Sequence, residues 1–481
     1  MMGVSLYTSR VVLQKLGVDD FGLYNIVGGI VVLFSVLNSS LAGSTQRFLN
    51  YELGKGNEES VDSVFQNSLA LHLVLCIILL LLSETVGLWY INSIMNVPTE
   101  RTEAANIVYQ FSVITFCVNV LRVPFNASII AYEKMDFYAY ISIVEAVLKL
   151  SIVYLLSICD FDRLIFYSFL VMSVTCIINA SYMVYCSKAF AAIHAKLQWD
   201  KGRIKAMLSF SGWSLFGSTA VISAQHGINL VLNYFCGVGL NAAAGIANQV
   251  TSAMYGFISN FQTAFNPQII KLYAQQKREE LFNLVFTASK ISFLLFWMIS
   301  VPVLYSAPLI LDLWLDSVPP HAVSFCRVII VFLLIDALNG PLWTAVNATG
   351  KIKNYQILMS SILLCNIPVA IIMLKIGYEP ESVWITKIFF NAVAMIGRIY
   401  YLIKLIQFPV LNYIRNVIIP IMSVSIIPSL VLLIVDIDNL ALINSLLLIV
   451  GMVCYTLAII LILGLSPKER NYILRVINIK S

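Results

Sequence analysis

The chain has 481 residues, 59% of them hydrophobic and only 11% charged, with a formal net charge of +5. A soluble domain carries roughly 25% charged residues, so this composition excludes a soluble fold, whose surface would need far more charge. Apolar blocks of about 20 residues match the length that a helix needs to cross a hydrocarbon layer of ~30 Å. The alternating ten-residue segments of a membrane barrel are absent. We therefore expect an all-α, polytopic membrane protein.

Apolar blocks between polar breaks predict about 14 transmembrane helices. The first half of the chain holds the predicted spans 1–16, 21–47, 65–90, 107–132, 137–159 and 164–186. The second half holds 208–235, 242–267, 284–313, 325–348, 355–376 and 383–406, followed by two further spans at 414–435 and 440–465. The first block is too short to cross comfortably, so we expect the true start of the protein to lie upstream.

The loops between these spans alternate in charge. Of the 30 Lys and Arg residues, 20 lie in or beside one set of loops and five in the opposite set. The positive-inside rule places the first set in the cytoplasm, together with the C-terminus. We expect a multi-pass protein of the bacterial cytoplasmic membrane.

The longest polar break, 187–207, divides the chain into two lobes. We predict an N-terminal lobe at 1–190, a cytoplasmic linker at 191–207, a C-terminal lobe at 208–407, and two final helices with a cytoplasmic tail at 408–481. In the break, Phe190, Ile193 and Leu197 share one helical face beside Trp199, which fits a helix on the inner membrane surface as well as it fits a plain basic loop.

The two lobes show weak internal similarity. Gly17-Val18 comes four residues before a new span, and Gly237-Val238 does the same in the second half. Residues 46–51 likewise resemble residues 268–273, and a lysine follows each segment. Both copies run from outside to inside, so the pattern predicts two six-helix lobes related by a parallel repeat, as in transporters whose lobes rock around a shared cavity.

Charged side chains inside a bilayer are costly and usually face a cavity or one another. Most of those in the predicted spans are basic: Arg10, Arg47, Arg122, Lys149, Lys290 and Lys387. Together they would line a cationic lumen that attracts an anion. The alternative for Arg47, Lys290 and Lys387 is that they reach the lipid headgroups.

The carboxylates in the spans are fewer. Asp336 has no local partner and is the candidate for coupling transport to H⁺ or Na⁺, although a salt bridge to a neighbouring helix is an equal alternative. Glu145 is a second candidate, but it lies four residues before Lys149, so the two side chains can neutralise each other. We interpret His226 as a hydrogen-bonded packing residue rather than a proton relay. The nine cysteines have no metal-ligand spacing, so we expect no metal or cofactor.

The sequence from Ser5 to Tyr24, with Arg10 and the Gly17-Val-Asp-Asp-Phe-Gly22 segment, resembles the start of bacterial polysaccharide-repeat flippases. Thr45-Gln-Arg47-Phe and Glu52-Leu-Gly-Lys-Gly56 are similar to the same family. These flippases belong to the multidrug/oligosaccharidyl-lipid/polysaccharide exporter superfamily. The likeness in length and lobe plan extends over the whole chain.

The resemblance implies a flippase that moves undecaprenyl-pyrophosphate-linked oligosaccharides across the cytoplasmic membrane by alternating access, for O-antigen or capsule assembly. It implies that Arg10 faces the lumen. The partners expected with it are the lipid-linked substrate, membrane lipids, and the polymerase and chain-length machinery. We expect a monomer with no nucleic-acid partner.

Two alternatives stay open. The first is a multidrug or cation antiporter of the same superfamily, which would favour an acidic cavity. The second is a membrane-embedded polysaccharide polymerase or ligase, which is disfavoured because such enzymes need a sizeable outer loop and no predicted outer loop exceeds about 17 residues.

Overall fold

The computed structural model describes residues 35–93, 98–158, 162–315, 318–432 and 442–466. It also describes residues 95 and 469–470 and scattered positions between 8 and 27. Over these residues every regular element is a helix, which confirms the predicted all-α class. The chain forms two compact units, Met1–Ser218 and Thr219–Ser481. Their boundary falls inside a helix, and the predicted four-part division of the chain stays a prediction.

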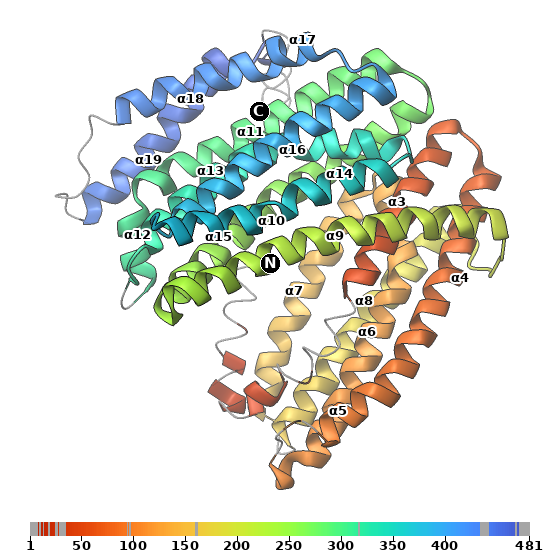
Figure 1. Ribbon diagram of the computed structural model, residues 1–481. Coiled ribbons are helices and arrows are strands. Elements are labelled where there is room, and N and C mark those ends of the chain that lie inside the picture. The colour runs from red at the N-terminus through yellow and green to blue at the C-terminus, as the bar shows by residue number, and fades with distance from the viewer. Residues whose placement is uncertain are drawn as a thin grey trace. The chain divides into compact units, whose positions relative to one another are not determined.

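The first unit contains long helices joined by short turns (Figure 1). Its helices are α3 (Ser35–Lys55), α4 (Glu58–Leu82), the π-helical turn η1 (Ser83–Gly87), α5 (Leu88–Ser93), the short 3-10 turn η2 (Thr99–Arg101), α6 (Thr102–Ala131), α7 (Met135–Ile158), α8 (Arg163–Ala189) and the first part of α9 (Lys201–Cys236). Helix α6 is central, because it packs against α3, α4, α7 and α8. Its buried side chains join those of α4 and α8 in one apolar cluster.

Arg101 links the ends of three segments of the first unit through ion pairs. Its guanidinium pairs with Asp20 at 2.7 Å and also with Asp162. Asp162 in turn accepts hydrogen bonds from the backbone amides of Leu164 and Ile165, and so caps the start of α8. Asp20 and Asp162 therefore stabilise these segment ends through Arg101.

The break between α8 and α9 is not a surface helix. Residues 191–200 form turns and extended backbone, and α9 begins at Lys201. Phe190 and Ile193 are buried, whereas Leu197 and Trp199 are exposed. The segment is held against α4, because His194 pairs with Asp62 at 3.0 Å and the Asp200 amide donates to Asn67. Of the two interpretations of the break, the loop is the one that the structure shows.

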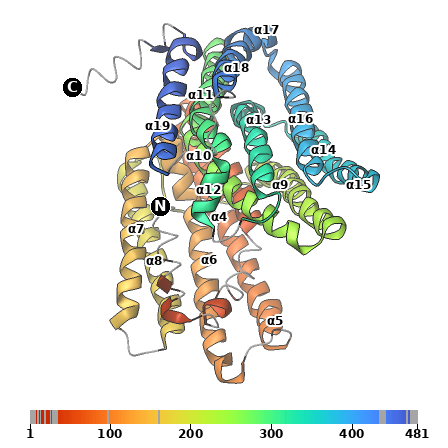
Figure 2. The same cartoon turned by 90° about the vertical axis from the view of Figure 1, so that its left-hand side faces the viewer.

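The second unit contains the rest of α9 and the remaining helices. These are α10 (Val238–Ala274), α11 (Arg278–Tyr305), α12 (Ala307–Trp314), α13 (Ala322–Ala348), α14 (Lys353–Leu364), α15 (Asn366–Ile376), α16 (Ser382–Ile406), α17 (Val410–Tyr413), η3 (Ile414–Ile418), α18 (Ile419–Leu432), α19 (Leu442–Ile459) and η4 (Ile460–Gly464). Helices α14 and α15 follow one another along α16, as Figures 1 and 2 show.

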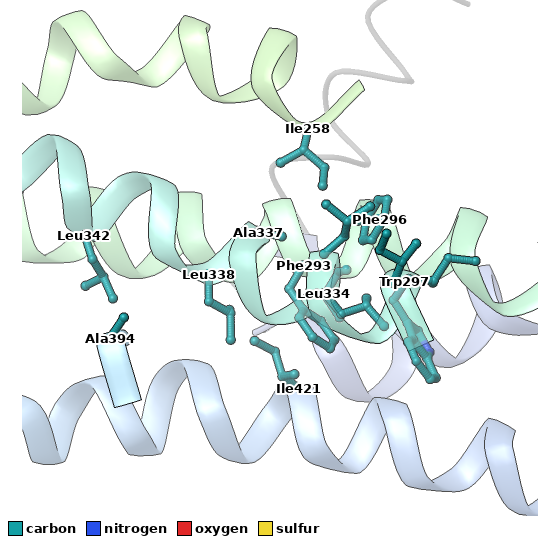
Figure 3. Close-up of a cluster of buried hydrophobic side chains, with 14 of the residues drawn as sticks. Ile258, Phe293, Phe296, Trp297, Leu334, Ala337, Leu338, Leu342, Ala394 and Ile421 are labelled. Carbon is teal, nitrogen blue, oxygen red and sulfur yellow. The ribbon is translucent and has the colours of Figure 1, made fainter. Parts of the chain in front are cut away.

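The core of the second unit is centred on α13, which packs against α10, α11 and α16. Figure 3 shows part of this core, where Leu334 and Leu338 of α13 lie among Phe293 and Trp297 of α11 and Ile421 of α18. The final two spans of the chain therefore pack on the unit through α11, because α18 and α19 both contact that helix.

Ten helices among the described residues are long and apolar enough to cross a membrane, and a shorter apolar helix covers Val410–Ile426. These ten helices correspond to ten of the twelve spans predicted between residues 65 and 465. Helix α10 and the shorter apolar helix cover the other two predicted spans. Of the first two predicted spans, the structure describes chiefly α3. This helix runs two turns beyond the predicted end at Arg47, to Lys55. The chain is thus a multi-pass membrane protein.

Backbone geometry at matching points agrees with the predicted repeat. Gly17 and Gly237, which the sequence pairs, both have positive φ, at 84° and 79°. Gly56 after α3 and Gln276 after α10 are also left-handed, at 71° and 58°. Each of these four residues follows the end of a helix, and its positive φ allows the chain to turn into the next helix.

Gly340 allows α13 to approach α10 closely. The Gln262 side chain of α10 donates to the carbonyl of Ala337 at 2.9 Å, and a Cβ on Gly340 would overlap that side-chain amide. We predict that Gly340→Ala lowers the free energy of unfolding by about 1 kcal/mol, because the Gln262 side chain has to move and loses its hydrogen bond to the Ala337 carbonyl. The measurement is the thermal unfolding temperature in nanodiscs.

Gly256→Ala on α10 is the matched control, because a Cβ there meets no atom within 4 Å. Alanine favours a helix over glycine, so this variant should keep or raise the unfolding temperature. Equal losses in the two variants would contradict the close approach at Gly340.

Candidate functional site

The second unit contains a polar seam between α13 and α16. Asp336 and Asn339 lie on one face of α13, and Lys387, Asn391 and Arg398 lie along the facing side of α16. We call these five residues the α13–α16 seam. Asp336 is partly buried and lies close enough to Arg398 and Lys387 to interact electrostatically with both. The predicted coupling carboxylate is therefore flanked by two cations from another helix.

The neighbours of Asp336 are held by specific contacts. Asn339 donates to Asn391 at 3.1 Å, and both amides are buried. Arg398 Nε donates to the buried hydroxyl of Tyr355 at 2.7 Å. Lys387 Nζ lies over the ring of Phe332, 4.4 Å from its centroid, in a cation–π contact. The seam thus places one carboxylate between two fixed cations at mid-span depth.

Arg47 in the first unit is buried under aromatic rings. Its guanidinium lies 4.7 Å from the ring of Phe48, 4.8 Å from that of Tyr51 and 5.8 Å from that of Phe210. Ser44, one turn earlier, donates to the carbonyl of Met207 in α9. Arg47 therefore helps to fasten the beginning of α9 onto α3, and its role in a lumen stays a prediction.

Arg122, Glu145 and Lys149 gather around Tyr182 in the first unit. Lys149 Nζ is 2.6 Å from Glu145 Oε1, the pairing that the four-residue spacing indicated. Arg122 lies over the ring of Tyr182 at 5.4 Å, and Glu145 interacts electrostatically with the same tyrosine. Arg122, Glu145 and Lys149, which we call the Arg122 group, comprise two cations and one carboxylate, so the group carries a net positive charge.

Lys290 of α11 is buried and paired. Its Nζ is 2.6 Å from Glu469 Oε2, and the exposed fractions of the two side chains are 6% and 20%. Ser466 donates to the same carboxylate from its amide and its hydroxyl, each at 2.7 Å. Burial raises the pKa of Glu469, but the hydrogen bonds and charge of Lys290 and the bonds from Ser466 outweigh it, and the pKa lies below its ordinary value.

The predicted lumen residues that the structure describes have different partners, and Arg10 lies outside the described residues. Arg47 contacts the rings of Phe48, Tyr51 and Phe210, whereas Arg122 lies over the ring of Tyr182. Lys290 of the second unit pairs with Glu469. The contribution of Arg398 to the environment of Asp336 was missed, since its position near a span end assigned it to the cytoplasmic loops.

An open pocket of about 350 Å³ lies between α9 and α10 in the second unit. Its lining residues are His226, Asn229, Leu230, Asn233, Gly245 and Asn248. Asn248 Nδ2 donates to Asn229 Oδ1 at 3.5 Å. His226, interpreted from the sequence as a packing residue, is exposed at this pocket instead. The signal that could have revealed the pocket is the helical spacing of 226, 229 and 233.

Two compact units of membrane-spanning helices are an arrangement found in secondary transporters. The family is shown by its sequence model: MatE matches residues 2–155 and 214–372, well over half of the chain, so the chain belongs to the MatE family. The two matched segments lie one in each half of the chain. Proteins of this family are transporters and not enzymes.

Solved structures support the same fold. A multidrug resistance MATE family transporter of the MOP superfamily, in an outward-facing conformation, gives a TM-score of 0.71 at 16% identity, covering 84% of this chain and 92% of the other. MATE in the straight conformation gives 0.71 at 18%, covering 84% and 93%. A MOP superfamily transporter from Pyrococcus furiosus, described as having a binding pocket of reverse polarity that suggests a different function, gives 0.68 at 16%, covering 84% and 92%.

One curated relative matches over a shorter stretch. The uncharacterized membrane protein EpsK of Bacillus subtilis (strain 168) is 24% identical over 156 residues, which is 32% of this chain and 31% of EpsK. The match thus spans about a third of that relative's length. At these identities the solved structures show a shared fold, and substrate has to be argued from the residues of this chain.

The Lys290–Glu469 pair generates a stability prediction. Glu469→Gln leaves the Lys290 ammonium buried without its counter-charge, so we expect the free energy of unfolding to fall by about 2 kcal/mol. Because the pKa of Glu469 is depressed in the folded protein, its contribution is fully present above the ordinary glutamate value of about 4.3 and is lost as the pH falls below that value through the lower pKa of the folded state. Thermal unfolding against pH is the measurement.

The matched control is Glu280→Gln, which breaks an exposed pair with Lys277. Exposed pairs contribute at most about 1 kcal/mol, so this variant should unfold close to the wild-type temperature. The account of Lys290 is wrong if Glu469→Gln and Glu280→Gln cost the same.

Proposed function

We propose that the chain is an ion-coupled exporter of the MatE family that works by alternating access, with Asp336 as the carboxylate that binds the coupling H⁺ or Na⁺. The α13–α16 seam is the observation that carries this proposal. A carboxylate at mid-span is costly unless it is paired or reached by water, and Asp336 is both partly accessible and flanked by Arg398 and Lys387.

The seam offers a physical route from ion binding to a change of conformation. When Asp336 takes up a proton it loses its charge, and its attraction to Arg398 and Lys387 is lost with it. The two cations then favour a different arrangement of α13 and α16, or bind an anion that enters. The free energy of the ion gradient is thereby transferred to the packing of two helices.

The comparisons favour the multidrug or cation antiporter over the oligosaccharide flippase as the substrate class. The outward-facing relative is a multidrug resistance transporter, and the family match by itself does not separate the two classes. We therefore take export of an amphipathic small molecule as the first candidate.

The flippase remains a second candidate because of the charges of the described residues. Two cations face one carboxylate in the α13–α16 seam, and the Arg122 group in the first unit also carries a net positive charge. Such surroundings attract a pyrophosphate and repel an organic cation. The substrate in this case is an undecaprenyl-pyrophosphate-linked oligosaccharide destined for O-antigen or capsule.

Asp336→Asn tests the coupling role. We expect this variant, reconstituted in proteoliposomes, to lose transport driven by an imposed H⁺ or Na⁺ gradient, because the amide cannot exchange a proton or neutralise a bound cation. Asp312→Asn is the matched control, since Asp312 is exposed at the outer end of α12. Gradient-driven transport that survives in Asp336→Asn would refute the role of this carboxylate.

Deleting the gene separates the two substrate candidates. The flippase predicts accumulation of lipid-linked sugar intermediates in the inner leaflet with unchanged uptake of ethidium, because only the sugar pathway is blocked. The multidrug exporter predicts the reverse. Mass spectrometry of the intermediates, leaflet by leaflet, and ethidium fluorescence in whole cells measure the two outcomes.

A further inference from the structure

The pocket between α9 and α10 has a chemical character that the proposed coupling site does not use. His226, Asn229 and Asn233 follow one another at spacings of three and four residues, so they lie on one face of α9. Asn248 faces them from α10, at 3.5 Å from Asn229. The opposite face of α9, with Ile228 and Leu232, is buried in the core of the second unit.

This polar face has to meet water rather than lipid. His226 and Asn233 are exposed and Asn229 is partly exposed, and hydrocarbon offers no hydrogen-bond partners for such groups. The side-chain oxygen of Asn248 is buried, and it has no hydrogen-bond partner within the part of the chain that the structure describes. The pocket therefore presents amide groups that a ligand or water can satisfy.

The lining also restricts the charge of a ligand. Among the six lining residues there is no Asp, Glu, Lys or Arg, so the pocket offers no counter-charge for an organic cation, and His226 is the one lining residue that can carry charge, as a cation. Asparagine amides both donate and accept hydrogen bonds, as do the hydroxyl groups of a sugar. The exposed side chain of Leu230 adds an apolar wall on which the C–H face of a sugar ring can pack.

We propose that the α9–α10 pocket is a binding subsite for a neutral saccharide, with Asn229, Asn233 and Asn248 as its hydrogen-bonding residues. The volume of about 350 Å³ lies at the lower end of ligand pockets, roughly 300–1,000 Å³, and suits one or two sugar rings. The proposal rests on the exporter function proposed above, and disaccharide binding would favour its second candidate, the flippase, over the first. In this proposal the pocket binds sugar hydroxyl groups, whereas the basic residues elsewhere bind the charged part of the substrate.

The experiment measures equilibrium binding of soluble disaccharides to the full chain in phospholipid nanodiscs, by saturation-transfer NMR. Cellobiose, maltose and chitobiose at millimolar concentration are the probes, and ethidium is the cationic counter-probe. Sugar-based detergents are avoided, because their headgroups would occupy the same pocket. We expect at least one disaccharide to bind and to lose affinity at least about tenfold, or 1.4 kcal/mol, in the Asn233→Leu/Asn248→Leu variant.

Two variants keep the result interpretable. Gln249→Leu also replaces a side-chain amide with leucine, next to Asn248 but outside the pocket lining, and this variant should bind the disaccharide like wild type. Gly245→Phe fills open space at the pocket wall, since a Cβ there meets no atom within 4 Å, and should abolish binding without removing a hydrogen bond. Unfolding temperatures close to wild type show that both variants are folded.

Each outcome decides the proposal. Disaccharide binding that is lost in the pocket variants and kept in Gln249→Leu supports it. Absence of binding by all three disaccharides, binding that the pocket substitutions leave unchanged, or displacement of the sugar by ethidium would overturn it. Binding needs no ion gradient, so a failure of ion-coupled export in proteoliposomes leaves this result standing and is recognised separately.

Discussion

The fold and the candidate sites all depend on one constraint: hydrocarbon cannot hydrogen-bond, so every polar group in a span must find its partner in the protein or in water. The backbone meets this demand by forming helices over all the described spans. Polar side chains meet it by pairing. Lys290 pairs with Glu469 and Lys149 pairs with Glu145, and Asn339 donates a hydrogen bond to Asn391.

We propose that transport depends on the places where this pairing is incomplete or unequal. The α13–α16 seam sets two cations against one carboxylate, so a change in the charge of Asp336 changes the balance of the whole seam. The α9–α10 pocket leaves amide groups open to a ligand. Within the second unit the proposed coupling carboxylate and the proposed recognition residues thus lie on different helix pairs, so that in our proposal one responds to an ion and the other to a substrate.

The sequence predicted what depends on local pattern. Hydropathy located the spans, and the four-residue spacing of Glu145 and Lys149 indicated their pair. It could not predict the partner of Lys290, because Glu469 lies 179 residues away, nor that α16 supplies the cations beside Asp336. The break after α8 shows the same limit, since Phe190 and Ile193 fit a surface helix by spacing, yet contacts of His194 and Asp200 with α4 hold the segment as a loop.

The central claim is that the polar face of α9 and α10 meets water inside the membrane. Single cysteines at positions 229, 233 and 248, in a variant lacking the nine native cysteines, can be treated with a membrane-impermeant maleimide in nanodiscs. Our account predicts rapid labelling at all three positions, and no labelling of a cysteine at Val147, an exposed apolar position of α7. Protection of positions 229, 233 and 248 from this reagent, together with their quenching by a lipid-borne spin label, would contradict it.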